Sequence, residues 1–136
     1  MENLIIAFGS DDGKNYTEKH FGDAEYYLLY ELTNQYAELQ RKIKNTSVIE
    51  IKEIHGDPLK AGSVVEMLQK ENVKVVVAAV FGPNIKRIKR QFVCILENKG
   101  LISDSIPHLM NKFPEILEIW NKGEARNHIN FKDTKK

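Results

Sequence analysis

One stretch decides the fold, Asp57 to Asn84, which reads DPLKAGSVVEMLQKENVKVVVAAVFGPN. Asp57-Pro58 supplies an N-cap followed by proline at the first helical position, and apolar residues then recur at spacings of three and four as far as Leu68. We therefore predict an amphipathic helix over 59–71. The β-branched run 73–81 follows, and such a run is typical of a strand covered on both faces. A helix followed by a buried strand predicts a crossover unit.

Other apolar segments extend this sheet on both sides. The run 4–8 ends in a polar turn, and the aromatic-rich segment 26–32 pairs with the next strand through a turn at 33–35. A short helix from Ile85 leads into one more buried run. The predicted strands are residues 4–8, 26–32, 36–44, 73–81 and 92–96. The fold class is α/β: a mixed five-stranded sheet of order 3-2-1-4-5, with strand 2 antiparallel and helices on both faces.

Length and composition indicate one domain over residues 1–136, because 42% of the residues are hydrophobic and no linker or repeat interrupts them. Residues 99–136 are predicted to be a helical extension with a frayed basic tail. Its apolar residues make two helical stripes, which Pro114 should separate by a break or kink. The inward-facing residues are Ile106, Leu109, Met110, Phe113, Ile116, Leu117 and Trp120.

Charge and cysteine content narrow the class of protein. The formal net charge is +1, so no overall field favours nucleic acid or a membrane surface. The single cysteine, Cys94, cannot form an internal disulfide, and it lies in a predicted buried strand as an inert thiol. We find no signal peptide and no apolar run near the roughly 20 residues that span a bilayer. A cytoplasmic location is expected.

Four loops should meet at the carboxyl edge of the sheet: residues 9–13, 20–22, 55–57 and 82–84. Ligands of open α/β sheets bind at such an edge, where connections diverge to opposite sides. Two predicted helix starts, near Asp57 and Pro83, would point backbone N-H groups into the crevice. An anion is the expected ligand.

Five short motifs carry a resemblance to a known family. In order they are Ala7-Phe8-Gly9-Ser10-Asp11-Asp12-Gly13, His20-Phe21-Gly22, Glu25 to Leu32, His55-Gly56 and Gly82-Pro83-Asn84. Together they resemble the dinitrogenase iron-molybdenum cofactor biosynthesis family of the NifX and NafY type, with residues 1–98 as the family core. The resemblance implies a ribonuclease H-like sheet and a non-catalytic role in carrying an iron-sulfur or iron-molybdenum type cluster. It also implies cluster donor and acceptor proteins as partners.

The resemblance further implies a set of site residues. His20 and His55 would be the metal ligands. The remaining cofactor-binding positions are Ser10, Asp11, Asp12, Gly82, Pro83 and Asn84. Each has a plainer interpretation: an acidic turn after a strand often bonds its own backbone, and a loop histidine often caps a turn. His108 and His128 are interpreted as structural or solvent-facing.

Two further functions stay open. One is a metal-dependent hydrolase or nuclease that uses Asp11, Asp12 and Asp57. The other is an interaction module for a small anion or a protein at the same edge. The basic residues of the helix from Ile85 could contact such a partner, although a charged outer face is also how a surface helix is solvated. No P-loop, GxSxG or HExxH motif supports an enzyme.

Overall fold

The computed structural model describes residues 2–46 and 58–132, with the backbone alone for 58–62. These residues form one six-stranded sheet of order β3-β2-β1-β4-β5-β6. The strands are β1 (Leu4–Ser10), β2 (Tyr26–Leu32), β3 (Ala37–Lys44), β4 (Val73–Ala78), β5 (Val93–Leu96) and β6 (Ile129–Asn130). The predicted order of the first five strands is confirmed, and β6 is an addition to it.

The antiparallel half of the sheet is the hairpin of β2 and β3. β2 pairs antiparallel with β1, from Leu4 opposite Leu32 to Ser10 opposite Tyr26, and β3 pairs antiparallel with β2. The Thr33 hydroxyl closes the hairpin by accepting the backbone N–H groups of Gln35 and Tyr36 at 3.0 and 3.1 Å. A side-chain acceptor in the turn explains why a segment without glycine can reverse here.

The parallel half consists of β1, β4, β5 and β6. Helix α2 (Pro58–Gln69) leads into β4, and helix α3 (Ile85–Gln91) leads from β4 into β5. Both crossovers were predicted. Because β1, β4, β5 and β6 run in the same direction, the segments that follow them leave from one carboxyl edge.

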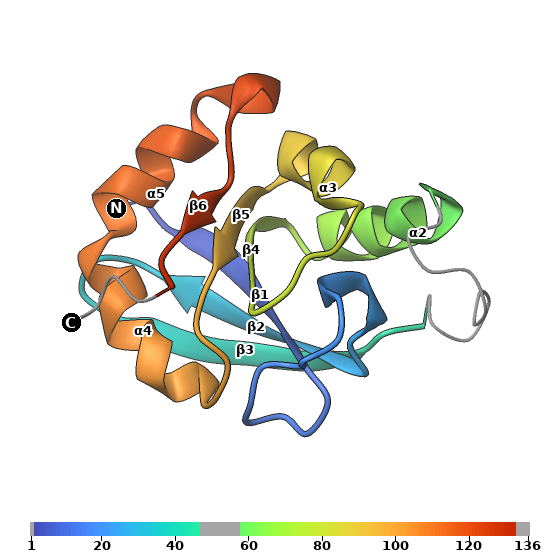
Figure 1. Ribbon diagram of the computed structural model, residues 1–136. Coiled ribbons are helices and arrows are strands. Elements are labelled where there is room, and N and C mark those ends of the chain that lie inside the picture. The colour runs from blue at the N-terminus through green and yellow to red at the C-terminus, as the bar shows by residue number, and fades with distance from the viewer. Residues whose placement is uncertain (1, 47–57, 133–136) are drawn as a thin grey trace.

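Helices cover both faces of the sheet (Figure 1), as predicted. Alternate residues of β4 explain why: Val75 and Val77 pack under α4 (Ile102–Asn111) and α5 (Phe113–Trp120), whereas Val76 and Ala78 pack under α2 and α3. This central strand is therefore buried on both sides. Within the described residues, no helix is long and apolar enough to cross a membrane.

The break between α4 and α5 falls at Lys112, next to the predicted breaker Pro114. Proline is tolerated at the second position of α5 because the N–H groups of a first turn have no helical partner. Leu109, Phe113 and Ile116 are buried. The other predicted inward residues pack against the same core: Ile106, Met110, Leu117 and Trp120. The predicted stripes are confirmed.

The segment after α5 returns to the sheet and is held there by Arg126. Its side chain is only 4% exposed. Its guanidinium donates to the carbonyls of Lys89 and Arg90 in α3 at 3.2 and 2.9 Å, and to the carbonyl of Trp120 in α5 at 3.0 Å. These bonds satisfy carbonyls at the ends of both helices. They deliver the chain to β6, where the Phe131 N–H bonds to the Leu96 carbonyl at 2.8 Å.

Candidate functional site

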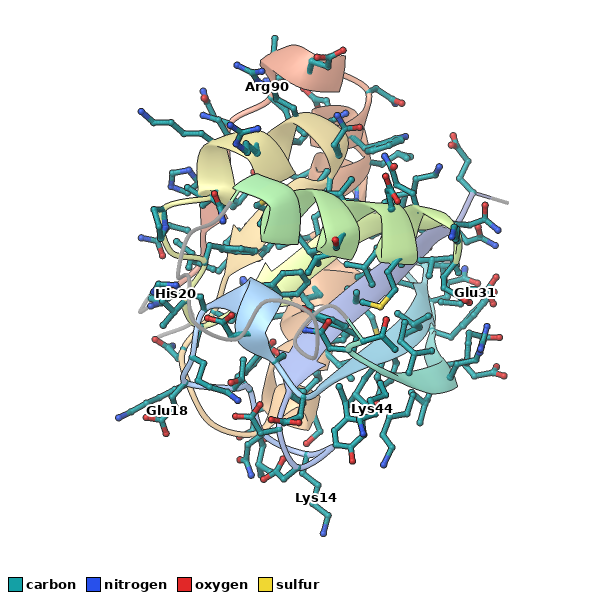
Figure 2. The ribbon with its side chains drawn as sticks, turned by 90° about the vertical axis from the view of Figure 1, so that its right-hand side faces the viewer. Lys14, Glu18, His20, Glu31, Lys44 and Arg90 are labelled. Carbon is teal, nitrogen blue, oxygen red and sulfur yellow. The ribbon has the colours of Figure 1, made fainter. Side chains whose placement is uncertain are left out.

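The loop that carries His20 docks against the segment that follows β4. The backbone N–H of Phe21 donates to the carbonyl of Val80 at 2.8 Å, and the Phe21 ring packs on Phe81 with centroids 5.4 Å apart. Two of the loops expected at the carboxyl edge therefore meet. Figure 2 shows Glu18 and His20 together on this side of the molecule, with Glu31 on the opposite side.

The imidazole of His20 occupies the space above Gly82. A Cβ atom added at Gly82 would lie 2.5 Å from Nδ1 and 2.6 Å from Cγ of His20, so only glycine admits the ring at this distance. Gly82 also has a φ of +80°, which glycine adopts without strain. The half-buried ring is thus placed by the turn after β4. An imidazole held in this way can act as a ligand to a soft or borderline metal.

The acidic turn, residues 10–15, uses its polar groups to bond itself. Oδ1 of Asp12 accepts the backbone N–H groups of Lys14 and Asn15, each at 2.8 Å. Its Oδ2 accepts the Asn15 side-chain amide at 2.8 Å. The buried Ser10 hydroxyl donates to the Asn15 carbonyl at 2.6 Å and accepts from the Gly13 N–H at 2.9 Å. These bonds hold the pKa of Asp12 well below its usual range, the Asn15 backbone N–H having the largest effect.

Asp11 also accepts hydrogen bonds from the chain itself, but from residues farther away in the sequence. Its Oδ2 accepts the Thr17 hydroxyl at 2.8 Å, and its Oδ1 accepts the Glu25 backbone N–H at 3.0 Å. Lys19 lies 3.4 Å from the same Oδ1. The carboxylate therefore ties the loop before His20 to the start of β2. Both aspartates have a structural use that accounts for all four oxygens.

Cys94 lies in β5 and is fully buried. Burial raises the pKa of its thiol to about 12. A metal ligand must be a thiolate, and this thiol stays protonated at neutral pH. The interpretation of Cys94 as an inert core thiol agrees with this geometry, and the folded chain offers no thiolate from it to a cluster.

The remaining expected positions are placed only in part. His55 and Asp57 lie outside the described residues. Asn84 is the N-cap residue of α3, which has seven residues, and Pro83 is exposed beside it. In the tail, His108 packs edge-on against Phe131 with centroids 4.8 Å apart, and His128 is exposed. Over 2–46 and 58–132, no group of three or more His, Cys, Asp or Glu side chains is arranged to hold a metal ion.

A pocket of about 250 Å³ opens at the same edge, where β4, β5 and β6 end. We refer to it as the β4–β6 pocket. Its lining residues are Glu18, Ala79, Val80, Asn98, Lys99 and Lys132. It adjoins the His20 loop, because Val80 accepts the Phe21 N–H.

The pocket was not predicted from the sequence. The rule that placed Gly82, that segments following parallel strands meet at the carboxyl edge, could have found part of its lining. Asn98 and Lys99 follow β5 as directly as Gly82 follows β4, so both belong at the carboxyl edge. Lys132 was inaccessible to that rule because β6 was not predicted. Three buried residues with polar groups were also missed: Tyr16, Ser105 and Glu97. The hydroxyls of Tyr16 and Ser105 form a hydrogen bond. The pKa of Tyr16 is raised by burial and by the charge of Glu97.

Comparison with known proteins identifies the family. The chain belongs to the dinitrogenase iron-molybdenum cofactor family, whose model matches residues 2–111. This confirms the resemblance to the NifX and NafY type and indicates involvement with the iron-molybdenum cofactor. Among curated proteins, none matches the chain. The match ends in α4, so α5, Arg126, β6 and Lys132 lie beyond it.

Proposed function

We propose that this protein is a non-catalytic carrier, which binds an iron-sulfur or iron-molybdenum type cluster at the carboxyl edge of its sheet and passes it between donor and acceptor proteins. The observation that carries the proposal is the placement of His20. Its imidazole is held over Gly82 at the point where the His20 loop meets the turn after β4. Family membership supplies the kind of cargo.

The ligands available suit carriage better than permanent attachment. Structural metal sites usually use several thiolates or imidazoles, and iron-sulfur clusters are typically held by four cysteines. Here the one thiol is buried in β5 and His20 is the imidazole at the edge. A cluster bound through one or two side chains can be released to an acceptor that offers more. His55 is the proposed second ligand.

The geometry favours this proposal over a metal-dependent hydrolase. Such enzymes fix a divalent cation with several carboxylates whose oxygens face the metal. The oxygens of Asp11 and Asp12 instead accept bonds from the protein's own backbone and side chains. A cation there would compete with these bonds and with Lys19, whose ammonium lies 3.4 Å from Oδ1 of Asp11.

The test is cluster retention by variants under anaerobic conditions. Wild type and His20→Ala are loaded with the same iron-molybdenum species, desalted, and assayed for iron and molybdenum. We expect His20→Ala to weaken retention by at least the roughly tenfold that loss of an outer-shell partner costs. His128→Ala is the matched control, because His128 is exposed in the tail. Equal retention by wild type and His20→Ala would refute the assignment of His20 as a ligand.

A further inference from the structure

The β4–β6 pocket collects positive charge from two strand ends that are far apart in sequence. Lys99 follows β5 and Lys132 follows β6, and parallel pairing of these strands brings both to one rim. Within the described parts of the chain, neither lysine forms an ion pair; the ion pairs there join Lys19 with Asp11 and Glu25, and Arg41 with Glu71. Two lysines that line one pocket repel each other, and an anion bound between them would relieve that repulsion.

We propose that this pocket is a binding site for a small oxyanion with two or more negative charges, such as phosphate or molybdate, either free or as part of a larger ligand. Lys99 and Lys132 would neutralise the charge, and the Asn98 amide is a further donor on the lining. The site goes beyond the proposed function, because oxyanion binding here needs neither His20 nor a cluster.

The size of the pocket selects this class of ligand. Its volume of about 250 Å³ lies below the roughly 300–1,000 Å³ of pockets for drug-sized ligands. That space accommodates a tetrahedral oxyanion with part of its hydration shell.

The walls of the pocket strengthen its electrostatics. Ala79 is buried, and Val80 is half-buried beside it. Of the two lysines, Lys132 is half-buried, so solvent screens its charge less than that of an exposed lysine, whereas Lys99 is exposed.

Glu18 is the one acidic residue of the lining. Its substitution should change the affinity for an oxyanion in the opposite direction to substitution of a lysine. A carboxylate at the rim repels an oxyanion and weakens its binding. Glu18→Gln should therefore tighten binding, while Lys99→Gln and Lys132→Gln should weaken it. A surface that attracts anions only through net charge would respond equally to any charge removed elsewhere.

The experiment is a titration with sodium molybdate at constant ionic strength, followed by isothermal calorimetry and by amide NMR shifts, with phosphate as competitor. We expect a single site with shifts centred on Val80, Asn98 and Lys99. Each lysine variant should bind about tenfold more weakly, as expected for loss of a hydrogen bond to a charged group. Glu18→Gln should bind more tightly than wild type.

Two controls make the outcome decisive. Lys70→Gln removes an exposed lysine beyond the C-terminal end of α2, at the opposite edge of the sheet, and should bind like wild type. His20→Ala should also bind molybdate like wild type, so that failure of the cluster proposal leaves this one intact. The proposal is overturned if wild type shows no saturable binding, or if Lys70→Gln weakens binding as much as Lys132→Gln.

Discussion

The acidic turn and the β4–β6 pocket both lie at the carboxyl edge of the sheet, yet they use charge in opposite ways. In the turn, each carboxylate oxygen of Asp11 and Asp12 accepts a hydrogen bond from the chain itself. In the pocket, Lys99 and Lys132 have no ion-pair partner among the described residues. Conspicuous charge in a sequence therefore does not identify a binding site; what distinguishes Lys99 and Lys132 is that the fold brings both to one pocket without an ion-pair partner.

The largest effect on stability should come from Gly82→Ala, which disturbs the segment next to the pocket and leaves the acidic turn alone. The new methyl group would clash with the His20 ring, and the residue would keep a φ of +80°. We expect a loss of about 3 kcal/mol in the free energy of unfolding, measured with urea, from backbone strain plus overpacking. Cluster retention should fall as it does in His20→Ala.

Gly123→Ala is the matched control for this substitution. Gly123 has a similar φ of +68°, but a Cβ there would meet nothing within 4 Å. It should therefore lose only the backbone part, about 1 kcal/mol. If both variants lose the same stability, the contact between His20 and Gly82 contributes nothing beyond the conformation of the turn.

A smaller effect on stability is expected from Asp11→Ala, which tests whether the aspartates of the acidic turn have a structural role. The substitution removes the acceptor for the Thr17 hydroxyl and the Glu25 N–H, so the free energy of unfolding should fall by about 1–2 kcal/mol. The double variant Lys99→Gln with Lys132→Gln should stay within about 0.5 kcal/mol of wild type, because no partner is lost. If the double lysine variant lost more stability than Asp11→Ala, the lysines would have the structural role and Asp11 would not.

The smallest effect concerns Asp12 and pH. Its folded-state pKa is depressed, mainly by the Asn15 backbone N–H, from an ordinary value of 3.8. The carboxylate therefore stabilises the fold above that ordinary value, and the contribution disappears as the pH falls through the lower folded-state pKa. We expect the difference in unfolding free energy between wild type and Asp12→Asn to shrink between about pH 4 and pH 2. A difference that stays constant on acidification would argue against this assignment.

The sequence was most informative where burial is continuous. The runs that became β1, β4 and β5 are apolar on both faces, and the crossover rule then fixed their order and direction. β6 escaped prediction because two residues give little periodicity, although Ile129 and Phe131 do alternate with polar neighbours. The short strand is stabilised by tertiary contacts, above all the bonds of Arg126, which no local pattern reports.

The site was predicted less completely for a related reason. Topology correctly brought the His20 loop to the turn after β4, since that juxtaposition depends only on strand direction. Whether a polar side chain is already satisfied depends on atoms several residues away, as with Asp11 and Glu25. The roles of His20 and His55 as ligands stay predictions, and His55 lies outside the described residues.

The position of Lys132 near the end of the sequence also means that the pocket lining is completed late in synthesis. Lys132 is added to the growing chain 33 residues after Lys99, a delay of about 2 to 7 seconds at typical rates of synthesis. Until β6 pairs, β5 is the outermost strand on this side of the sheet, and an unpaired strand edge is open to pairing by other chains. The docking of residues 129–132 pairs β6 with Ile95 and Leu96 and brings Lys132 to Lys99, so one folding step covers part of that edge and completes the lining of the pocket.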